Sequence, residues 1–439
     1  MRRREAAIIF RALLLIVVSV SVSGCWDSRE LVEFAFAGAV GIDRGSAPGL
    51  LRVTVLVPIP AALAGPGSAE GGAGGSSAQP VAISATAEGT AFFDANRILN
   101  RLTARTIDYT HTRILIIGED LAREGLAPVI DLLHRNTDFR RSLLVAVADG
   151  TTAEEMLLSV RPDLARSPTD YLAGLVSSGF TFFGEVPLVR VHDLDLANVG
   201  PNLEIALPLL RLEPKPPFPV PPGAGAGGGG GQGAGGGQSG GGGGAGGGGE
   251  AAAPPPERRA AVSGTALFRN DRMVAKLDPV ETMGFLLVQG RFRRGLVTVR
   301  GPETEETPVV FEVARDRSRC RVRRQGDEFS VEIAVKLAAS IEDVAGPAQV
   351  VDATNYPALK ALLEAELERR MTAAINKAKT ELGGDPFNLG LAARRTFRSW
   401  PEWANFDWHG AFREADVTVR AEITSIRPNL SFQAPVSHE

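Results

Sequence analysis

The sequence predicts an α+β fold built from two mixed α/β modules, each with a sheet flanked by helices. In the first module, apolar strand-like runs alternate with segments whose apolar residues recur at helical spacing. In the second, several strand-like runs precede one long amphipathic segment. A tract rich in Pro and Gly separates the modules at residues 213–257, and such a composition cannot bury enough apolar surface to fold.

Residues 1–24 have the pattern of a secretory signal peptide. Arg2, Arg3 and Arg4 precede a short apolar run at 12–22. This run falls short of the roughly 20 apolar residues that a membrane-spanning helix needs. The segment therefore predicts export and does not predict a transmembrane helix.

The end of this segment resembles the lipobox of bacterial lipoproteins. Val22-Ser23-Gly24-Cys25 places a branched apolar residue and two small residues before a cysteine. In such proteins the cysteine receives a diacylglyceryl group and the signal peptide is cut before it, here between Gly24 and Cys25. Because two acyl chains suffice for stable attachment to a bilayer, we expect a lipoprotein anchored through Cys25 on the extracytoplasmic face of the cell membrane. An ordinary signal peptide, or a membrane anchor that ends in Gly-Cys, is the alternative.

The first module covers residues 25–212. Its predicted elements are strands at 34–42 and 50–57 joined by a hairpin-like loop, a helix at 92–102, a strand at 113–118, a helix at 121–134 and a strand at 142–148. Residues 64–78 are mainly Gly, Ala and Ser, so we expect a mobile surface loop there. The spacing of Thr152 and Glu155 matches a capping box, which predicts the start of a further helix.

The tract at 213–257 predicts a linker that joins the modules loosely. The second module covers 258–433 and leaves a tail at 434–439. Its predicted strands lie at 262–269 and 273–277 around an Asn270-Asp271 turn, and then at 296–299, 309–313, 329–337 and 417–423. An apolar stripe predicts a long amphipathic helix at about 357–382, ended by Gly383-Gly384.

Composition and spacing argue against several classes of function. The net charge of −4 provides no global positive field for nucleic acid. The five histidines have no ligand spacing, and no phosphate loop or nucleophile elbow is found, so we expect no metal, no cofactor and no catalytic residue. His111, just before a predicted strand, is expected to stabilise a turn. The two cysteines are Cys25 and Cys320, and lipidation of Cys25 would leave Cys320 without a partner.

An alternating run of arginines is the first candidate contact surface. A period of two would place all five guanidinium groups on one face of a strand: Arg315, Arg317, Arg319, Arg321 and Arg323. We single out Arg317, Arg319 and Arg321 as possible contacts to anionic lipid headgroups or to a partner. The solvated outer face of a sheet explains the pattern equally well.

The densest aromatic cluster is the second candidate. Trp400, Trp403, Phe406 and Trp408 lie within nine residues of one another. Large aromatic side chains are favoured anchors at protein interfaces, so the three tryptophans could contact a partner subunit. Burial against the long helix is the favoured alternative.

Several blocks resemble one family, the C subunits of bacterial spore-germination receptors, known as Ger(x)C lipoproteins. The similar blocks are Gly24-Cys25-Trp26-Asp27-Ser28-Arg29-Glu30-Leu31 with Gly41-Ile42-Asp43; His111-Thr112-Arg113 through Ile117-Gly118-Glu119-Asp120-Leu121-Ala122; Gly264-Thr265-Ala266-Leu267-Phe268 with Lys276-Leu277; and Asp385-Pro386-Phe387 leading to Trp400-Pro401 and Trp408. They touch both modules in the family's order, whereas the two Gly-rich tracts depart from its pattern.

The resemblance implies a non-enzymatic subunit of a nutrient-sensing complex in the inner spore membrane. Its partners would be the membrane-embedded A subunit and the transporter-like B subunit, and its mixed α/β modules could form three structural domains. An extracytoplasmic solute-binding lipoprotein of a transport system is the alternative function. A flexible tract between modules would be a poor hinge for such a protein, and neighbouring genes would discriminate the two.

Overall fold

The computed structural model describes residues 4–6, 8, 10–14, 30–59, 81–159, 167–194, 204–214, 258–300, 308–344 and 355–428. The predicted cleavage and lipidation site at Gly24 and Cys25, the Gly/Ala/Ser loop at 64–78, almost all of the tract at 213–257 and the tail at 434–439 lie outside these residues. Across the described ranges, no helix combines the length and apolar character needed to cross a membrane.

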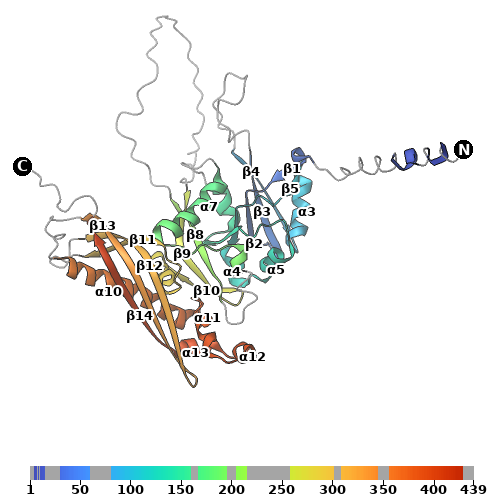
Figure 1. The fold of residues 1–439 in the computed structure, drawn as a ribbon. Coiled ribbons are helices and arrows are strands. Elements are labelled where there is room, and N and C mark those ends of the chain that lie inside the picture. The colour runs from blue at the N-terminus through green and yellow to red at the C-terminus, as the bar shows by residue number, and fades with distance from the viewer. Residues whose placement is uncertain are drawn as a thin grey trace, which may run out of the picture.

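The larger of the two main sheets has eight strands in the order β10-β9-β8-β7-β6-β2-β3-β4 (Figure 1). In chain order these strands are β2 (Ala39–Arg44), β3 (Leu51–Pro58), β4 (Ala82–Gly89), β6 (Ile114–Gly118), β7 (Leu144–Asp149), β8 (Ala206–Pro214), β9 (Arg258–Arg269) and β10 (Arg272–Leu277). A separate two-stranded parallel sheet joins β1 (Phe34–Phe36), which follows a 3₁₀ turn at Leu31–Glu33, to β5 (Thr106–Asp108).

Helices cover both faces of the eight-stranded sheet. Leu115 and Ile117 of β6 face a core shared with α3 (Phe92–Leu102), α4 (Glu119–Glu124) and α5 (Ala127–Arg135). Ile114 and Ile116 face a second core, shared with α6 (Ala153–Ser159) and α7 (Pro168–Ser178). The continuous apolar run of β6 therefore reflects a parallel strand that is buried on both faces. A π-helical turn at Gly179–Phe183 follows α7.

The second main sheet has four strands in the order β11-β12-β13-β14. They are β11 (Arg294–Arg300), β12 (Pro308–Gln325), β13 (Glu328–Val344) and β14 (Asp416–Arg427). Helices α9 (Pro279–Val288) and α10 (Tyr356–Lys377) share one core with the inner face of this sheet (Figure 1). Between α10 and β14 lie short helices α11 (Gly390–Ala393), α12 (Trp400–Ala404) and α13 (Trp408–Glu414), with a 3₁₀ turn at Arg394–Thr396.

The α+β class and the flanking of sheets by helices are confirmed. The long predicted helix is present as α10 continued by a π-helical turn at Ala378–Leu382, and it ends at Gly383, whose φ of +67° favours glycine. Strands β4, β5 and β8 and helices α7, α9 and α11 to α13 were not predicted. Strand β8 contains Pro208 and runs into the Pro-rich tract, which concealed its strand character.

The strands that flank the Pro/Gly-rich tract are paired with each other. Strands β8 and β9 are antiparallel neighbours whose ladder begins at Pro214 opposite Arg258. Residues 215–257 therefore connect two adjacent strands of one sheet, and the expectation that they join the modules loosely is wrong. The predicted loop near 64–78 occupies the equivalent place in another hairpin, because Pro58 of β3 pairs with Ala82 of β4.

The outer edge of the four-stranded sheet is covered by α10. Strand β14 ends the sheet, so its outward N–H groups lack a strand partner. The Ala421 N–H donates to Glu368 at 3.0 Å and the Ile423 N–H donates to Glu364 at 2.7 Å. These two glutamates, one helical turn apart on α10, replace the missing strand at this edge.

Candidate functional site

The predicted lipidation site lies outside the described residues, so modification of Cys25 and cleavage after Gly24 stay predictions. The described body of the molecule begins five residues after Cys25, at Glu30. The other candidate residues lie in the second module, on β12 and in the short helices before β14.

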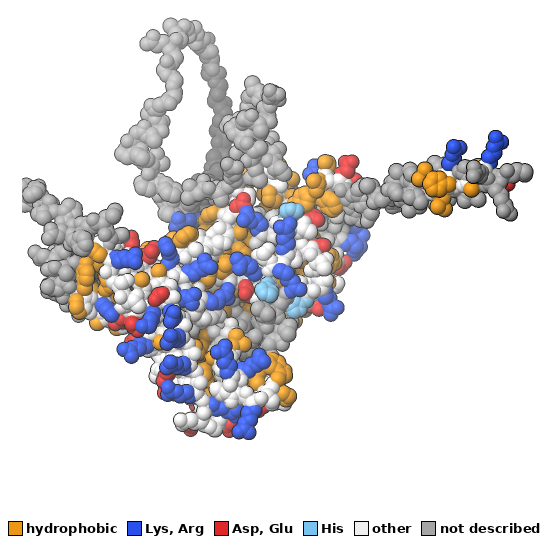
Figure 2. All heavy atoms as spheres, in the orientation of Figure 1, with side chains coloured by type: hydrophobic (Ala, Val, Ile, Leu, Met, Phe, Trp, Pro, Cys, Tyr) orange, Lys and Arg blue, Asp and Glu red, His pale blue; other side chains and the backbone are white. Residues whose placement is uncertain are grey.

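Arg317, Arg319 and Arg321 lie together on the outer face of the four-stranded sheet. They pair across the ladder with Lys336, Ala334 and Glu332 of β13, which are not among its core-facing residues. All three arginines are exposed, and none has an ion pair within the described ranges. Figure 2 shows Lys and Arg side chains over the whole face in view, including the part where Figure 1 places β12 and β13.

A β-bulge separates Arg315 from this group. Arg315 pairs with Leu337, which faces the core, whereas Arg317 pairs with the next residue back, Lys336. The register shift moves Arg315 to the other face, where its guanidinium donates to the Gly290 carbonyl. The prediction that all five arginines share one face is therefore wrong for Arg315.

The three tryptophans do not form one surface. The exposed fractions are 49% for Trp400, 3% for Trp403 and 0% for Trp408. Trp408 packs edge-on against Phe329 of β13 at 5.3 Å, in the same core as α10. Burial excludes Trp403 and Trp408 as partner contacts in this structure. Trp400 remains available, and the guanidinium of Arg394 lies over its ring at 4.5 Å.

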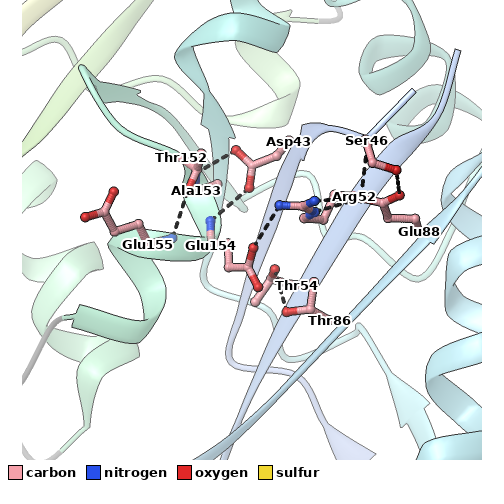
Figure 3. Close-up of polar contacts among 10 residues, drawn as sticks. All are labelled: Asp43, Ser46, Arg52, Thr54, Thr86, Glu88, Thr152, Ala153, Glu154 and Glu155. Atoms are coloured by element: carbon pink, nitrogen blue, oxygen red, sulfur yellow. Dashed lines mark hydrogen bonds and ion pairs between the residues drawn. The ribbon is translucent and has the colours of Figure 1, made fainter. Parts of the chain in front are cut away.

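Asp43, from the block Gly41-Ile42-Asp43, caps α6 from the neighbouring strand β2 (Figure 3). Its carboxylate accepts the Ala153 N–H at 2.7 Å and the Glu154 N–H at 2.9 Å. Burial raises the pKa of Asp43 despite these hydrogen bonds. The arrangement requires glycine at position 118, because a Cβ on Gly118 would clash with the Asp43 carboxylate.

Figure 3 also shows a polar cluster that ties β3 to β4 and α6. Arg52 bridges Glu88 at 2.8 Å and Glu154 at 3.3 Å. The predicted capping box is half formed: the Glu155 N–H donates to the Thr152 hydroxyl at 3.0 Å. The Glu155 carboxylate instead accepts from the Thr151 hydroxyl and pairs with Arg258 of β9.

Lys276 joins the two sequence modules. Its ammonium on β10 lies 2.7 Å from Glu119 and 2.5 Å from Asp149, at the ends of β6 and β7. Burial lowers the pKa of Lys276, but the hydrogen bonds to both carboxylates outweigh it and leave this pKa above its ordinary value. Two blocks identified separately in the sequence thus meet in one ion cluster.

Asp385, from the block Asp385-Pro386-Phe387, is fully buried and organises the short helices. It accepts the Trp408 indole N–H at 2.8 Å and the Gly390 N–H at 2.7 Å. Burial raises the pKa of Asp385, although the hydrogen bonds oppose this. The sequence identified this block only by resemblance and gave it no role.

A buried contact between Glu204 and His409 was not predicted. Glu204 lies just before β8, accepts the Asn270 N–H at 2.9 Å and faces the His409 imidazole at 3.4 Å. Burial raises the pKa of Glu204 to about 7 and lowers that of His409. The Asp385 N–H donates to His409 Nδ1, which leaves Nε2 to face Glu204. Neither residue carried a sequence signal, because their pairing depends on the fold.

The buried charged groups described above stabilise contacts between distant segments of the chain. Asp43, Lys276 and Asp385 are each occupied by partners from elsewhere in the chain. Among the residues that the structure describes, no three His, Cys, Asp or Glu side chains are placed to hold a metal ion.

Comparisons with known proteins agree with the blocks named above. Residues 27–212 match the family model described as "Spore germination protein N-terminal domain", and residues 263–429 match "Spore germination B3/ GerAC like, C-terminal". The spore germination protein KC of Bacillus subtilis (strain 168) is 23% identical over 98% of this chain and 97% of that protein. YfkR of the same strain is 32% identical over 38% of this chain and 42% of that protein. The crystal structure of the GerBC protein is similar at a TM-score of 0.47 and 14% identity, covering 91% of this chain and 100% of that chain.

Proposed function

The chain belongs to the Ger(x)C family of spore germination proteins, and from this premise we propose that it is a lipoprotein subunit of a nutrient-germinant receptor. It acts without catalysis, as an interaction or signalling subunit of the receptor complex. A diacylglyceryl group on Cys25 holds it on the extracytoplasmic face of the inner spore membrane, beside the A and B membrane subunits.

One observation carries this proposal. Both germination-protein modules match in order, at 27–212 and 263–429, so nearly all of the chain outside the signal segment and the Gly-rich tract is accounted for. The lipobox-like end of the signal segment supports the anchoring, because it supplies a thiol at the position where this modification occurs.

The fold argues against the solute-binding alternative. Such proteins close two lobes around a ligand by a hinge. Here β9 and β10 of the second module continue the sheet of the first, and Lys276 pins β10 to Glu119. This continuity restricts the hinge motion that solute capture requires.

The anchoring is tested by Cys25→Ala, with Cys320→Ala as the matched control. We expect Cys25→Ala to abolish lipidation and the cleavage that depends on it, because only a thiol accepts the diacylglyceryl group. Cys320→Ala should behave as the parent. Mass spectrometry of the mature amino terminus decides the matter: an unmodified Cys25, or cleavage elsewhere, would refute the lipoprotein proposal.

The receptor role is tested in spores of the source organism. Deletion of the gene should slow or abolish germination in response to at least one nutrient, and the parent gene should restore it. Complementation by Cys25→Ala should fail where anchoring positions the subunit beside its partners. A normal response of the deletion strain to every nutrient tested would overturn the proposal.

The outer arginine face is the candidate contact surface for a partner subunit. Figure 1 places β12 at the far end of the molecule from β1, which begins nine residues after Cys25, so this face is remote from the proposed anchor. Replacing Arg317, Arg319 and Arg321 by Gln should weaken germination while leaving binding to anionic vesicles unchanged. Weaker vesicle binding at low salt would show that the face contacts lipid instead. If neither germination nor vesicle binding changed, the face would be a solvated surface without a contact role.

A further inference from the structure

A hollow of about 650 Å³ opens where the amino-terminal ends of β6 and β7 meet α7. Its walls carry His111 and Arg113 before β6, Arg140 before β7, and Arg190 beside the first residue of β7. Helix α7 contributes Asp170, the one acidic residue among the described residues of the lining. The hollow is therefore strongly cationic although the chain as a whole carries a net charge of −4.

Two of these guanidinium groups have no acidic partner among the residues that the structure describes. Asp170 pairs with Arg113. Arg140 and Arg190 are exposed, and no ion pair to either is found in the described part of the chain. The guanidinium group presents a planar fork of donors that matches the oxygens of a phosphate, which makes Arg the preferred residue for such contacts.

The hollow is next to the segment that leads to Cys25. A second, smaller hollow of about 250 Å³ shares His111, Arg113 and Asp170 with it and is lined by residues 34–38 of β1 and the following turn. The His111 imidazole packs edge-on against Phe36 at 4.8 Å. Both hollows therefore lie at the end of the molecule that carries β1, which begins nine residues after Cys25.

Chain length limits how far this end can be from the membrane. Glu30 lies five residues after Cys25, and an extended chain of that length spans about 17 Å at most. Leu31 and Val32, the next residues, are largely exposed apolar side chains. An anchor at Cys25 thus keeps the β1 end close to the headgroup layer. The surface potential of an anionic bilayer falls off over a Debye length of about 8 Å, so this end feels it when it lies against the membrane.

We propose that this cationic hollow binds the phosphate group of an anionic phospholipid. The site orients the body of the protein on the membrane, because it adds a second contact beside the acyl chains. The choice of a lipid phosphate over a free one rests on the proposed anchor at Cys25, whereas the recognition of phosphate rests on the hollow alone.

The test uses the mature chain without its acyl groups, so that its result does not depend on Cys25. We expect this chain to bind phosphatidylglycerol vesicles at low salt and to bind phosphatidylcholine vesicles weakly. Arg140→Gln with Arg190→Gln should reduce phosphatidylglycerol binding about tenfold or more, since each basic group near an anionic surface contributes a severalfold factor. The control is Arg272→Gln with Arg398→Gln, two exposed arginines of the second module that remove the same charge.

A second variant separates a site from diffuse attraction. Arg140→Lys with Arg190→Lys keeps the charge but removes the planar fork, so a phosphate site should lose affinity while a diffuse field should not. Unfolding by urea checks that each variant remains folded. Equal losses in the hollow variant and the control, or full binding by the Lys variant, would overturn the proposal.

Free glycerol 1-phosphate distinguishes the sources of phosphate. If it competes with vesicles only weakly, the site serves the membrane surface, as proposed. If it binds tightly to the chain alone, the hollow takes a soluble phosphate ester and the lipid assignment is wrong. Mass spectrometry of Cys25 is independent of these results, so failure of the anchor and failure of the hollow are distinguished.

Discussion

At the scale of single residues, three buried carboxylates hold segments of the chain together. Asp43, Glu204 and Asp385 each accept at least one backbone N–H, and burial raises the pKa of all three. A buried carboxylate without donors is costly, so these hydrogen bonds fix which segments must lie together. Each of the three links elements that are distant in the sequence.

The cap formed by Asp43 should be measurable. Asp43→Ala leaves the N–H groups of Ala153 and Glu154 without their acceptor, and we expect a loss of about 1–3 kcal/mol in the free energy of unfolding. Gly118→Ala should cost a similar amount by pushing the Asp43 carboxylate away. Urea unfolding of both single variants and the double variant checks this. Fully additive losses would show that Gly118 acts independently of the cap.

Glu204 should make stability depend on pH. Its folded pKa of about 7 exceeds its ordinary value of 4.5, so folding favours the protonated form. The stability it contributes is complete below about pH 4.5 and is lost as the pH rises through about 7. Glu204→Gln removes this loss, so its stability relative to the parent should increase from pH 5 to pH 8 by on the order of 2–3 kcal/mol.

His409 is retained in the parent and the variant, so the comparison reports Glu204 together with its contact to His409. The control is Glu328→Gln, which replaces an exposed carboxylate at the turn between β12 and β13. Its effect should be the same at both pH values. Parallel pH profiles for the parent and Glu204→Gln would contradict the prediction.

At the scale of elements, the sequence predicted what depends on local periodicity. Strand β6 and helix α10 follow directly from apolar runs and stripes. The bulge at Arg315 could not be predicted, because the alternating pattern continues through it and the register is set by the partner strand β13. The contact of Glu204 with His409 could not be predicted either, since the two lie 205 positions apart in the chain and only the tertiary fold joins them.

Two lysine pairs allow burial to be tested as a determinant of ion-pair strength. Lys276 faces Glu119 and Asp149, whose side chains are 14% and 20% exposed, whereas Lys336 faces Glu422, whose side chain is 47% exposed. Lys276→Met should cost about 2–4 kcal/mol because it leaves the poorly solvated Asp149 carboxylate without its cation and leaves Glu119 with Arg123 alone. Lys336→Met should cost less than about 1 kcal/mol. Comparable losses in urea unfolding would show that burial does not set the difference.

At the scale of the whole molecule, the boundary seen in the sequence is not a boundary between sheets. The eight-stranded sheet takes β8 from the first module and β9 from the second. Composition predicts that residues 215–257 form no core, but it cannot show that the flanking strands pair with each other. Only the pairing of β8 with β9 shows that the tract is an insertion in a hairpin and not a linker between modules.

Because β8 and β9 pair directly, we expect that the tract at 215–257 can be replaced by a short turn. Halving a loop lowers its closure cost by about 0.6 kcal/mol, so a four-residue turn between Pro214 and Arg258 should raise stability by about 2 kcal/mol. Urea unfolding should keep one cooperative transition, since both modules share the sheet. A fall of several kcal/mol, or loss of cooperativity, would show that the tract contributes ordered contacts.

The two α10 glutamates at the edge of β14 affect whether two copies of this protein can pair through that edge. An open strand edge invites a second chain to extend the sheet, which is a common route to aggregation. Glu364 and Glu368 take the Ile423 and Ala421 N–H groups that such a chain would need, and they add negative charge along the approach. A second copy that approaches this edge therefore meets two occupied N–H groups and two carboxylates, which disfavours pairing of copies strand to strand.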